Sequence, residues 1–167
     1  MSKRLDSRIL ILLSEIDKTE EAISKVNEFY LKVKSDMPDD TKDRDQCHAV
    51  LLSEVFVNYY TCVESMFFRI SQFFENGLAK ERWHADLLEK MRLNIRGIRN
   101  AVISDKTYTE LNELLKFRHF KRYYYDYNYD WDRLDLLENK YKHLAIHLPK
   151  EFTDFKMFLE EIENSNG

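Results

Sequence analysis

The residues best suited to chemistry lie together at residues 117–126, in the segment Phe-Arg-His-Phe-Lys-Arg-Tyr-Tyr-Tyr-Asp. On an α-helix, Arg118, Arg122 and Tyr125 recur at one-turn spacing and share one face. Guanidinium groups bind phosphate through paired, charge-assisted hydrogen bonds, and phenol rings stack on nucleic-acid bases. This face is therefore poorly suited to a hydrophobic core and well suited to a phosphate-containing ligand.

Histidine supplies the candidate group for proton transfer. His119 and Tyr123 form a second pair one helical turn apart, beside the first face. An imidazole titrates near neutral pH, whereas a phenol with a reference pKa of about 10 is a poor base at pH 7. His48 and His84 stand apart from this segment, and we expect a structural role for each. The alternative for the whole segment is an amphipathic helix with a solvated basic face.

A second row of basic residues precedes this segment. Arg92, Arg96 and Arg99 repeat the same helical spacing. If this row folds toward the first segment, the two groups make a positive groove that suits RNA, with Arg92, Arg96 and Arg99 opposite Arg118, Lys121 and Arg122. Tyr123 and the tyrosines after it would then stack on bases. The competing interpretation is that the second row is a solvated helix face.

The sequence indicates neither a metal site nor a bound cofactor. The Asp-x-Asn-x-Asp pattern at residues 126–130 resembles the start of a calcium loop, but its sixth position carries Trp131 instead of glycine. His143 and His147 lie one turn apart in a predicted helix, and no third ligand is evident near them. Glycine-rich phosphate loops and nucleophile elbows are absent from the sequence.

A few long helices must position these residues. The 167 residues include only three glycines and two prolines, and this shortage of turn formers favours an all-α protein. Apolar residues recur at helical spacing, and the second segment is apolar on nearly all sides and should be central. We predict one domain over residues 1–167, an up-and-down bundle of four or five helices. The expected helices are residues 5–34, 42–75, 80–94, 106–125 (capped by Asp105) and 131–163 (kinked at Pro149).

Charge, cysteine content and hydropathy indicate which ligands and which cellular compartment to expect. The formal net charge is −4, so RNA binding would need a local basic patch. Cys47 and Cys62 lie about 22 Å apart in one predicted helix and cannot form a disulfide within it, which is typical of buried thiols in a reducing compartment. No segment has the length and hydropathy of a signal peptide or a membrane span. We therefore expect a cytoplasmic protein with no membrane contact.

The segment at residues 117–126 resembles that of the HepT-like ribonuclease toxins of the HEPN superfamily. The likeness includes the Leu-Leu pair before it and Asp-Trp-Asp-Arg-Leu at residues 130–134. It extends to Asn-Tyr-Tyr-x-x-Val-Glu at residues 58–64 and to Trp-His-x-x-Leu-Leu at residues 83–88. Because these segments cover most of the chain, the resemblance implies a HEPN-like helical bundle.

The superfamily motif is an Arg, an adjacent polar residue and a His five positions after the Arg, to which HepT proteins add a Tyr. In this sequence Arg118 matches the Arg and His119 matches the polar residue. Tyr123 stands at the position of the His, and Tyr125 matches the terminal Tyr. The resemblance implies that Arg118 binds the scissile phosphate and that His119 or Tyr123 acts in proton transfer.

The resemblance also implies a function and a set of partners. HepT-like toxins are metal-independent ribonucleases that act on tRNA or other RNA, with the site at the interface of a homodimer or a larger assembly. A small nucleotidyltransferase antitoxin of the MNT type neutralises them by transferring AMP to the tyrosine, which is Tyr125 here. The alternatives are a catalytically inactive HEPN protein that binds RNA or a nucleotidyltransferase without cleavage, and a plain helical adaptor.

Overall fold

Five α-helices make up most of the computed structural model, which describes residues 2–75 and 83–166. In chain order they are α1 (Ser2–Asp36), α2 (Gln46–Glu75), α3 (Trp83–Met91), α4 (Asp105–Arg122) and α5 (Trp131–Asn166), and a short 3₁₀ turn, η1 (Thr41–Asp43), precedes α2. No strand occurs in either described range. The predicted all-α fold is confirmed.

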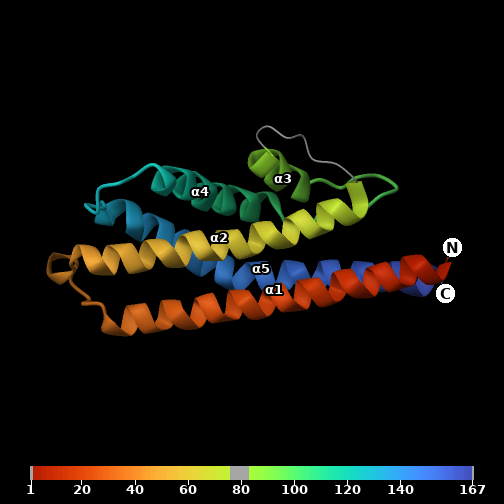
Figure 1. Cartoon of the computed structure of the whole chain (residues 1–167), viewed down its shortest axis with the longest axis horizontal. Coiled ribbons are helices and arrows are strands. Elements are labelled where there is room, and N and C mark those ends of the chain that lie inside the picture. Colours follow the sequence, from red (N-terminus) through yellow and green to blue (C-terminus); the bar gives the residue numbers. More distant parts are fainter. Residues whose placement is uncertain (1, 76–82, 167) are drawn as a thin grey trace.

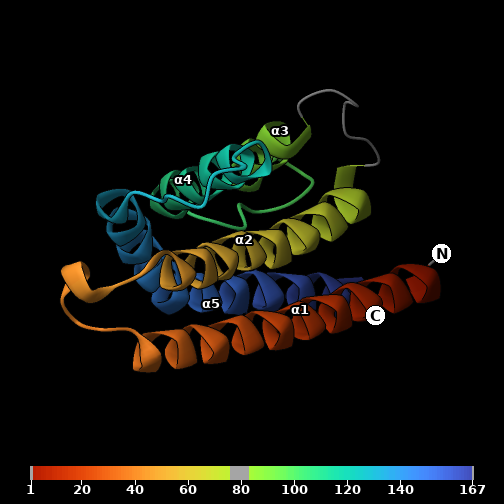
Figure 2. The same ribbon diagram turned by 60° about the vertical axis from the view of Figure 1, so that its left-hand side comes forward.

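The three longest helices form the body of the bundle. Helices α1, α2 and α5 run side by side along the long axis of the molecule, and α3 and α4 lie over α2 on the side away from α1 (Figure 1, Figure 2). Helix α2 contacts each of the other four helices. It is the segment that the sequence predicts to be central, and buried side chains occur along it from Ala49 to Ser71.

Local sequence signals set the ends of α4. The helix begins after Ser104, whose side chain accepts a hydrogen bond from the backbone N–H of Thr107. Asp105, the predicted cap, lies instead in the first turn, where its charge complements the helix dipole. The helix ends at Arg122, earlier than the predicted residue 125. The predicted start of α3, at residue 80, lies outside the described residues.

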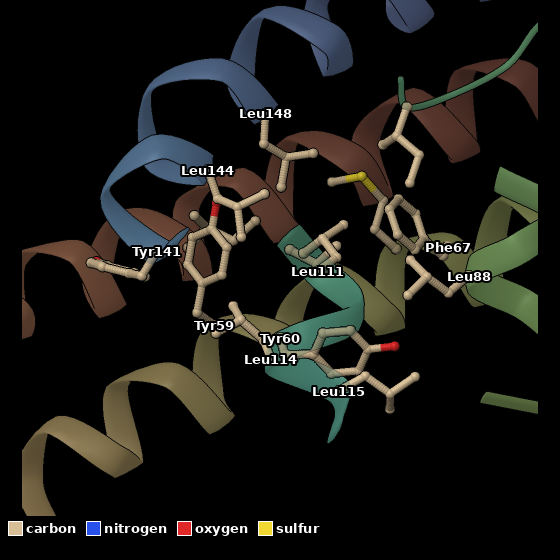
Figure 3. Packing of buried hydrophobic residues seen from close by; sticks show 14 of the residues in the cluster. Tyr59, Tyr60, Phe67, Leu88, Leu111, Leu114, Leu115, Tyr141, Leu144 and Leu148 are labelled. Atoms are coloured by element: carbon tan, nitrogen blue, oxygen red, sulfur yellow. The ribbon is translucent and has the colours of Figure 1, made fainter. Parts of the chain in front are cut away.

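Aromatic side chains fill the centre of the bundle. Tyr59 and Tyr60 project from neighbouring positions of α2 in different directions, Tyr59 toward Leu144 of α5 and Tyr60 along α4 (Figure 3). The ring centroid of Tyr141 lies 5.1 Å from that of Tyr59 in an edge-to-face arrangement. All four side chains are buried. The core therefore fixes α2 against both α4 and α5.

Polar contacts also join α1 to α5. The hydroxyl of Tyr30 donates a hydrogen bond to Oε1 of Glu138 at 2.5 Å, and Nζ of Lys34 lies 3.1 Å from the same oxygen. The hydroxyl of Tyr141 donates to Oδ1 of Asn27 at 2.5 Å. Since Glu138 and Tyr30 are both buried, these bonds satisfy groups that water does not reach.

The exposure of the two cysteines differs from the prediction. Cys47 is exposed in the first turn of α2, and only Cys62 is partly buried, so the prediction of two buried thiols is wrong. Both thiols are free. Across the two described ranges, no helix combines the length and the apolar character that crossing a bilayer requires.

Candidate functional site

One buried carboxylate joins three helices. Glu64 of α2 is 6% exposed, and its two oxygens have different partners. Oε2 accepts a hydrogen bond from Nη1 of Arg118 on α4, and Oε1 lies 2.5 Å from Nδ1 of His84 on α3. An ionised carboxylate only accepts hydrogen bonds, so His84 carries a proton on Nδ1 and donates it to Glu64. We call Glu64, His84, Arg118 and His119 the Glu64 cluster.

Arg118 is the cation of this cluster. Its guanidinium carbon lies 5.5 Å from the ring centroid of Tyr60, so the face of the ring supports the charge from one side. Desolvation by burial raises the pKa of Tyr60, and the phenol therefore stays protonated. The side chain of Arg118 is 18% exposed, so the guanidinium reaches solvent while Glu64 holds it.

Two imidazoles lie next to each other in the cluster. The ring centroids of His84 and His119 are 5.9 Å apart, with the rings nearly perpendicular. Desolvation of part of its ring lowers the pKa of His119, and the nearby positive groups of His84, Arg118 and Arg122 lower it further, against a smaller opposing effect of Glu64. His119 is therefore neutral at pH 7 and able to accept a proton.

Solvent reaches the cluster from the side of α2. An open pocket of about 270 Å³ is lined by Glu64, Ser65, Phe68 and Arg69. His119 itself is exposed on the last turns of α4. A ligand can therefore reach Glu64 from this pocket on α2 and His119 from the exposed surface of α4.

The tyrosine-rich segment after α4 is a connector rather than helix. Tyr123 and Tyr125 are 70% and 84% exposed, and they follow the last helical residue, Arg122. The predicted helical face that Arg118 shares with Tyr125 is therefore wrong. Between Tyr123 and Tyr125 in the connector lies Tyr124, whose ring stacks on Phe120 at a centroid distance of 4.6 Å.

The far end of the connector is held by α2. The backbone N–H of Tyr129 donates to Oε1 of Gln46 at 2.8 Å, and Nε2 of Gln46 donates to the carbonyl oxygen of Tyr129 at 3.2 Å. The hydroxyl of Tyr124 donates to the carbonyl oxygen of Asn128 at 2.7 Å. These contacts fix both ends of the connector and leave the exposed tyrosine rings on its outer side.

The structure separates the basic residues that the sequence groups together. Arg122 is exposed at the end of α4, and among the described residues no side-chain hydrogen bond or ion pair holds it. Lys121 forms an ion pair with Glu54 of α2. Arg96 is exposed in the loop between α3 and α4. Only Arg122 is thus both close to the Glu64 cluster along the chain and accessible to a phosphate.

Arg99 does not belong to an RNA-binding surface. Its side chain is fully buried and forms an ion pair with Glu75 at 2.6 Å. The guanidinium also donates to the carbonyl oxygens of Lys90, Leu93 and Asn100. All five N–H donors of the guanidinium are used in this way, since two of them go to Glu75. The prediction that Arg99 contacts RNA is therefore replaced by a role in holding the loop.

The second arginine row is not helical. Helix α3 ends at Met91, and the chain then turns through Gly97, whose φ of +75° favours glycine. Arg92 turns toward Glu89 and Asp105 and lies 4.4 Å from the ring of Tyr108. The predicted basic groove built from this row is wrong, because a loop replaces the expected helix face.

A family model described as "HepT-like protein" matches residues 51–159, well over half of the chain. The chain belongs to the HepT-like family. Membership indicates a HEPN-type, toxin-like protein, and the helical bundle agrees with it. Comparisons with curated proteins and with solved structures gave no match.

The site of this HepT-like chain contains two residues that sequence periodicity misses. The sequence predicts a purely structural role for His84 and none for Glu64. Both nevertheless lie in segments that carry the family resemblance, residues 58–64 and residues 83–88. That resemblance was the available signal, because periodicity relates only residues on the same helix.

A second histidine pair in the HepT-like chain, His143 and His147, lies on α5, where His143 contacts Glu110 of α4. Nδ1 of His143 lies 2.7 Å from Oε2 of the buried Glu110, and Nζ of Lys106 lies 2.8 Å from Nε2 of the same ring. The ring centroid of His147 is 4.0 Å from that of His143. The described part of the chain contains no cluster of three or more His, Cys, Asp or Glu side chains placed to hold a metal ion.

Proposed function

We propose that this HepT-like protein is the toxin of a HEPN/MNT-type toxin–antitoxin pair, a metal-independent ribonuclease that cleaves tRNA or other RNA. The observation that supports it is the Glu64 cluster, in which a solvent-accessible Arg118 and a neutral His119 lie together. Cleavage of RNA without a metal needs a base for the 2′-hydroxyl, an acid for the leaving oxygen, and cations for the phosphorane. The cluster contains groups of each kind.

In this proposal His119 takes the proton of the 2′-hydroxyl as the 2′-oxygen attacks phosphorus. The P–O5′ bond then breaks, the leaving oxygen takes a proton from a second group of the cluster, and the products are a 2′,3′-cyclic phosphate and a 5′-hydroxyl. Arg118 binds the scissile phosphate and offsets the charge that develops on it, with Arg122 assisting. Tyr123 is an exposed phenol that stacks on a base, and it replaces the His of the family motif.

The remaining RNA contacts and the assembly are part of the same proposal. Arg96 and Lys121 bind phosphates away from the scissile bond, Lys121 by exchanging its ion pair with Glu54. A homodimer brings two copies of α4 together, so that the cluster of each protomer lies at the shared interface. The protein acts in the cytoplasm, where its RNA substrates occur.

Regulation acts on the exposed connector. Tyr125 is 84% exposed, so its hydroxyl is available to a nucleotidyltransferase antitoxin that transfers AMP to it. The added phosphate is an anion close to Arg122 in the chain, and it competes with the phosphate of RNA for the same cation. Modification of Tyr125 thereby lowers affinity for the substrate.

The test is cleavage of tRNA by the purified protein in the presence of a metal chelator. We expect Arg118→Ala to reduce the rate by about a hundredfold or more, as the loss of one group that stabilises transition-state charge does in other enzymes. Lys116→Ala is the matched control, because Lys116 is an exposed cation of the same helix and pairs with Glu113. Absence of cleavage by the wild type, at concentrations where it binds tRNA, would defeat the enzymatic proposal.

A second candidate function is RNA binding without cleavage. Two observations favour it: Tyr123 stands where the motif has a His, and Glu64 offsets part of the charge of Arg118. In that case the wild type binds tRNA and leaves it intact, and Tyr123→His creates both cleavage and toxicity. In a protein that already cleaves RNA, the same substitution changes the rate little.

A further inference from the structure

The motif of this chain lacks one proton carrier. Tyr123 occupies the position of the motif His, directly after the last residue of α4, and its side chain is 70% exposed. The motif segment contains one imidazole, that of His119. The same imidazole cannot accept the proton of the 2′-hydroxyl and donate a proton to the leaving oxygen in one step. A general base and a general acid acting on the same phosphodiester require two groups. Some other residue must supply the second.

We infer that His84 is this second proton-transfer residue and that Glu64 is the residue that positions it. The inference rests on the proposed ribonuclease function. His84 comes from α3, a different helix from the motif, and it reaches the motif residues through Glu64. In this chain a histidine from another helix therefore performs the proton transfer that the motif assigns to the residue at position 123.

The contact with Glu64 defines how His84 is held. Nδ1 of His84 donates to Oε1 of Glu64 at 2.5 Å, and Glu64 is only 6% exposed. A buried carboxylate on one ring nitrogen fixes both the orientation of the ring and its tautomer, as it does in catalytic triads and at metal-bound histidines. The nitrogen that exchanges a proton with substrate is then Nε2, on the opposite side of the ring.

The two rings are close enough to act on one phosphodiester. The centroids of His84 and His119 are 5.9 Å apart, and Arg118, which binds the phosphate, shares Glu64 with His84. His119 takes the proton from the 2′-hydroxyl, so the leaving oxygen receives its proton from Nε2 of His84. His84 regains a proton from solvent after the 5′-hydroxyl product leaves, and His119 releases one.

The experiment compares two oligoribonucleotides under single-turnover conditions. One has the ordinary 5′-oxygen at the scissile phosphate, and the other has a bridging sulfur at that atom. A thiol has a pKa of about 8.5, so a thiolate leaves without help from an acid. The variants are His84→Ala, His84→Gln, His119→Ala and Glu64→Gln, with Lys116→Ala as the control, because Lys116 is an exposed cation of α4 outside the Glu64 cluster. Thermal melting verifies that each is folded.

We expect His84→Ala and His84→Gln to cleave the oxygen substrate about 10²–10⁴-fold more slowly than the wild type. Both should regain most of the wild-type rate on the sulfur substrate. Glu64→Gln should also be slower on the oxygen substrate and regain rate on the sulfur substrate. If Glu64 only stabilised the fold, its substitution would slow the cleavage of both substrates alike. His119→Ala should be slow on both substrates, and Lys116→Ala should be close to the wild type on both. Free imidazole should partly restore His84→Ala.

Other results overturn the inference in distinguishable ways. If the wild type cleaves RNA but the His84 variants cleave the oxygen substrate within about twofold of it, the ribonuclease function stands and the role of His84 falls. The same conclusion follows if the His84 variants are slow on both substrates, or if Lys116→Ala loses as much activity as they do. If the wild type cleaves neither substrate, the proposed function itself falls, and this inference with it.

Discussion

His119 accepts a proton only while its imidazole is neutral, and the charges around it decide the pH at which that holds. Desolvation and the positive groups of His84, Arg118 and Arg122 lower its pKa, so the neutral form persists below the usual imidazole range. A base with a lowered pKa remains active as the pH falls toward about 6.5 and loses activity below it. We therefore expect the acid limb of the kcat/KM profile to lie below pH 6.5.

Arg122→Gln tests the cause of this shift. Removing one of the positive charges that lower the pKa of His119 should move the acid limb to higher pH by about half a unit, as expected for one solvent-screened charge. The position of the limb is the relevant measurement, because the substitution also weakens phosphate binding and lowers the whole profile. Lys116→Gln should leave the limb in place. A limb that moves to lower pH in Arg122→Gln would contradict this account.

The sequence predicts two of the four residues of the Glu64 cluster. Helical spacing and the family motif find Arg118 and His119, because both lie in one continuous segment. They miss Glu64 and His84, because the contact from Arg118 to Glu64 spans 54 positions and that from His84 to Glu64 spans 20. Contacts of this separation are set by helix packing, about which periodicity along one helix carries no information.

The side chain of Arg99 makes many contacts in the loop between α3 and α4. Arg99 is buried, and its five donors bind the carboxylate of Glu75 and three backbone carbonyl oxygens. Within the loop, one backbone bridge pairs Ile95 with Arg99 itself. Arg99 therefore links this loop to the end of α2 through Glu75.

We predict that Arg99→Ala lowers the free energy of unfolding by about 3 kcal/mol, because it leaves the mostly buried Glu75 without its main partner. Arg96→Ala is the matched control, since Arg96 is exposed in the same loop. Its effect on stability should stay within about 0.5 kcal/mol. Urea denaturation followed by circular dichroism measures both. Equal stabilities of the two variants would show that the buried guanidinium does not hold the loop.

The elements themselves show where sequence periodicity fails. The spacing of Arg92, Arg96 and Arg99 is helical, yet the chain leaves the helix at Met91 and turns at Gly97. Similarly, α4 stops at Arg122 although the residues after it fit a continued helix. In both places tertiary contacts satisfy the backbone or side chains better than another helical turn would, and such contacts override local propensity.

Across the whole molecule, Glu138 joins the first helix to the last. Burial by itself raises the pKa of Glu138, but hydrogen bonds from Tyr30 and Lys34 and the charges of Lys34 and Lys142 outweigh it, so the pKa is lowered. A carboxyl group with a lowered pKa in the folded state stabilises the protein above the pKa of the unfolded state. That stabilisation is lost as the pH falls through the folded pKa.

Glu138→Gln should therefore reduce the free energy of unfolding at pH 7 by about 1.5–3 kcal/mol, the range for hydrogen bonds to a charged group. Its stability should also fall less than that of the wild type between pH 7 and pH 3. Glu160→Gln, at an exposed position of α5, should follow the wild type at every pH. Denaturant titrations at several pH values provide the comparison. A Glu138→Gln variant as pH-sensitive as the wild type would rule out this carboxylate as the source.

The architecture as a whole was the most predictable part. Scarce glycine and proline, together with long apolar stripes, predict the helical bundle and the central position of α2, and both are confirmed. Polar ties between distant helices, such as that between Tyr30 and Glu138, span 108 positions and leave no mark on local patterns. Composition therefore predicts which helices form, and packing decides which polar groups meet.

Glu64 is subject to two demands at the same time. Its carboxylate holds the short helix α3 to α2 through His84, and it also holds the guanidinium that is expected to receive substrate. A substitution that releases Arg118 to bind phosphate more tightly also loosens α3. Variants that change this position should consequently keep their activity only together with compensating mutations between α2 and α3, so laboratory evolution at Glu64 would require paired changes.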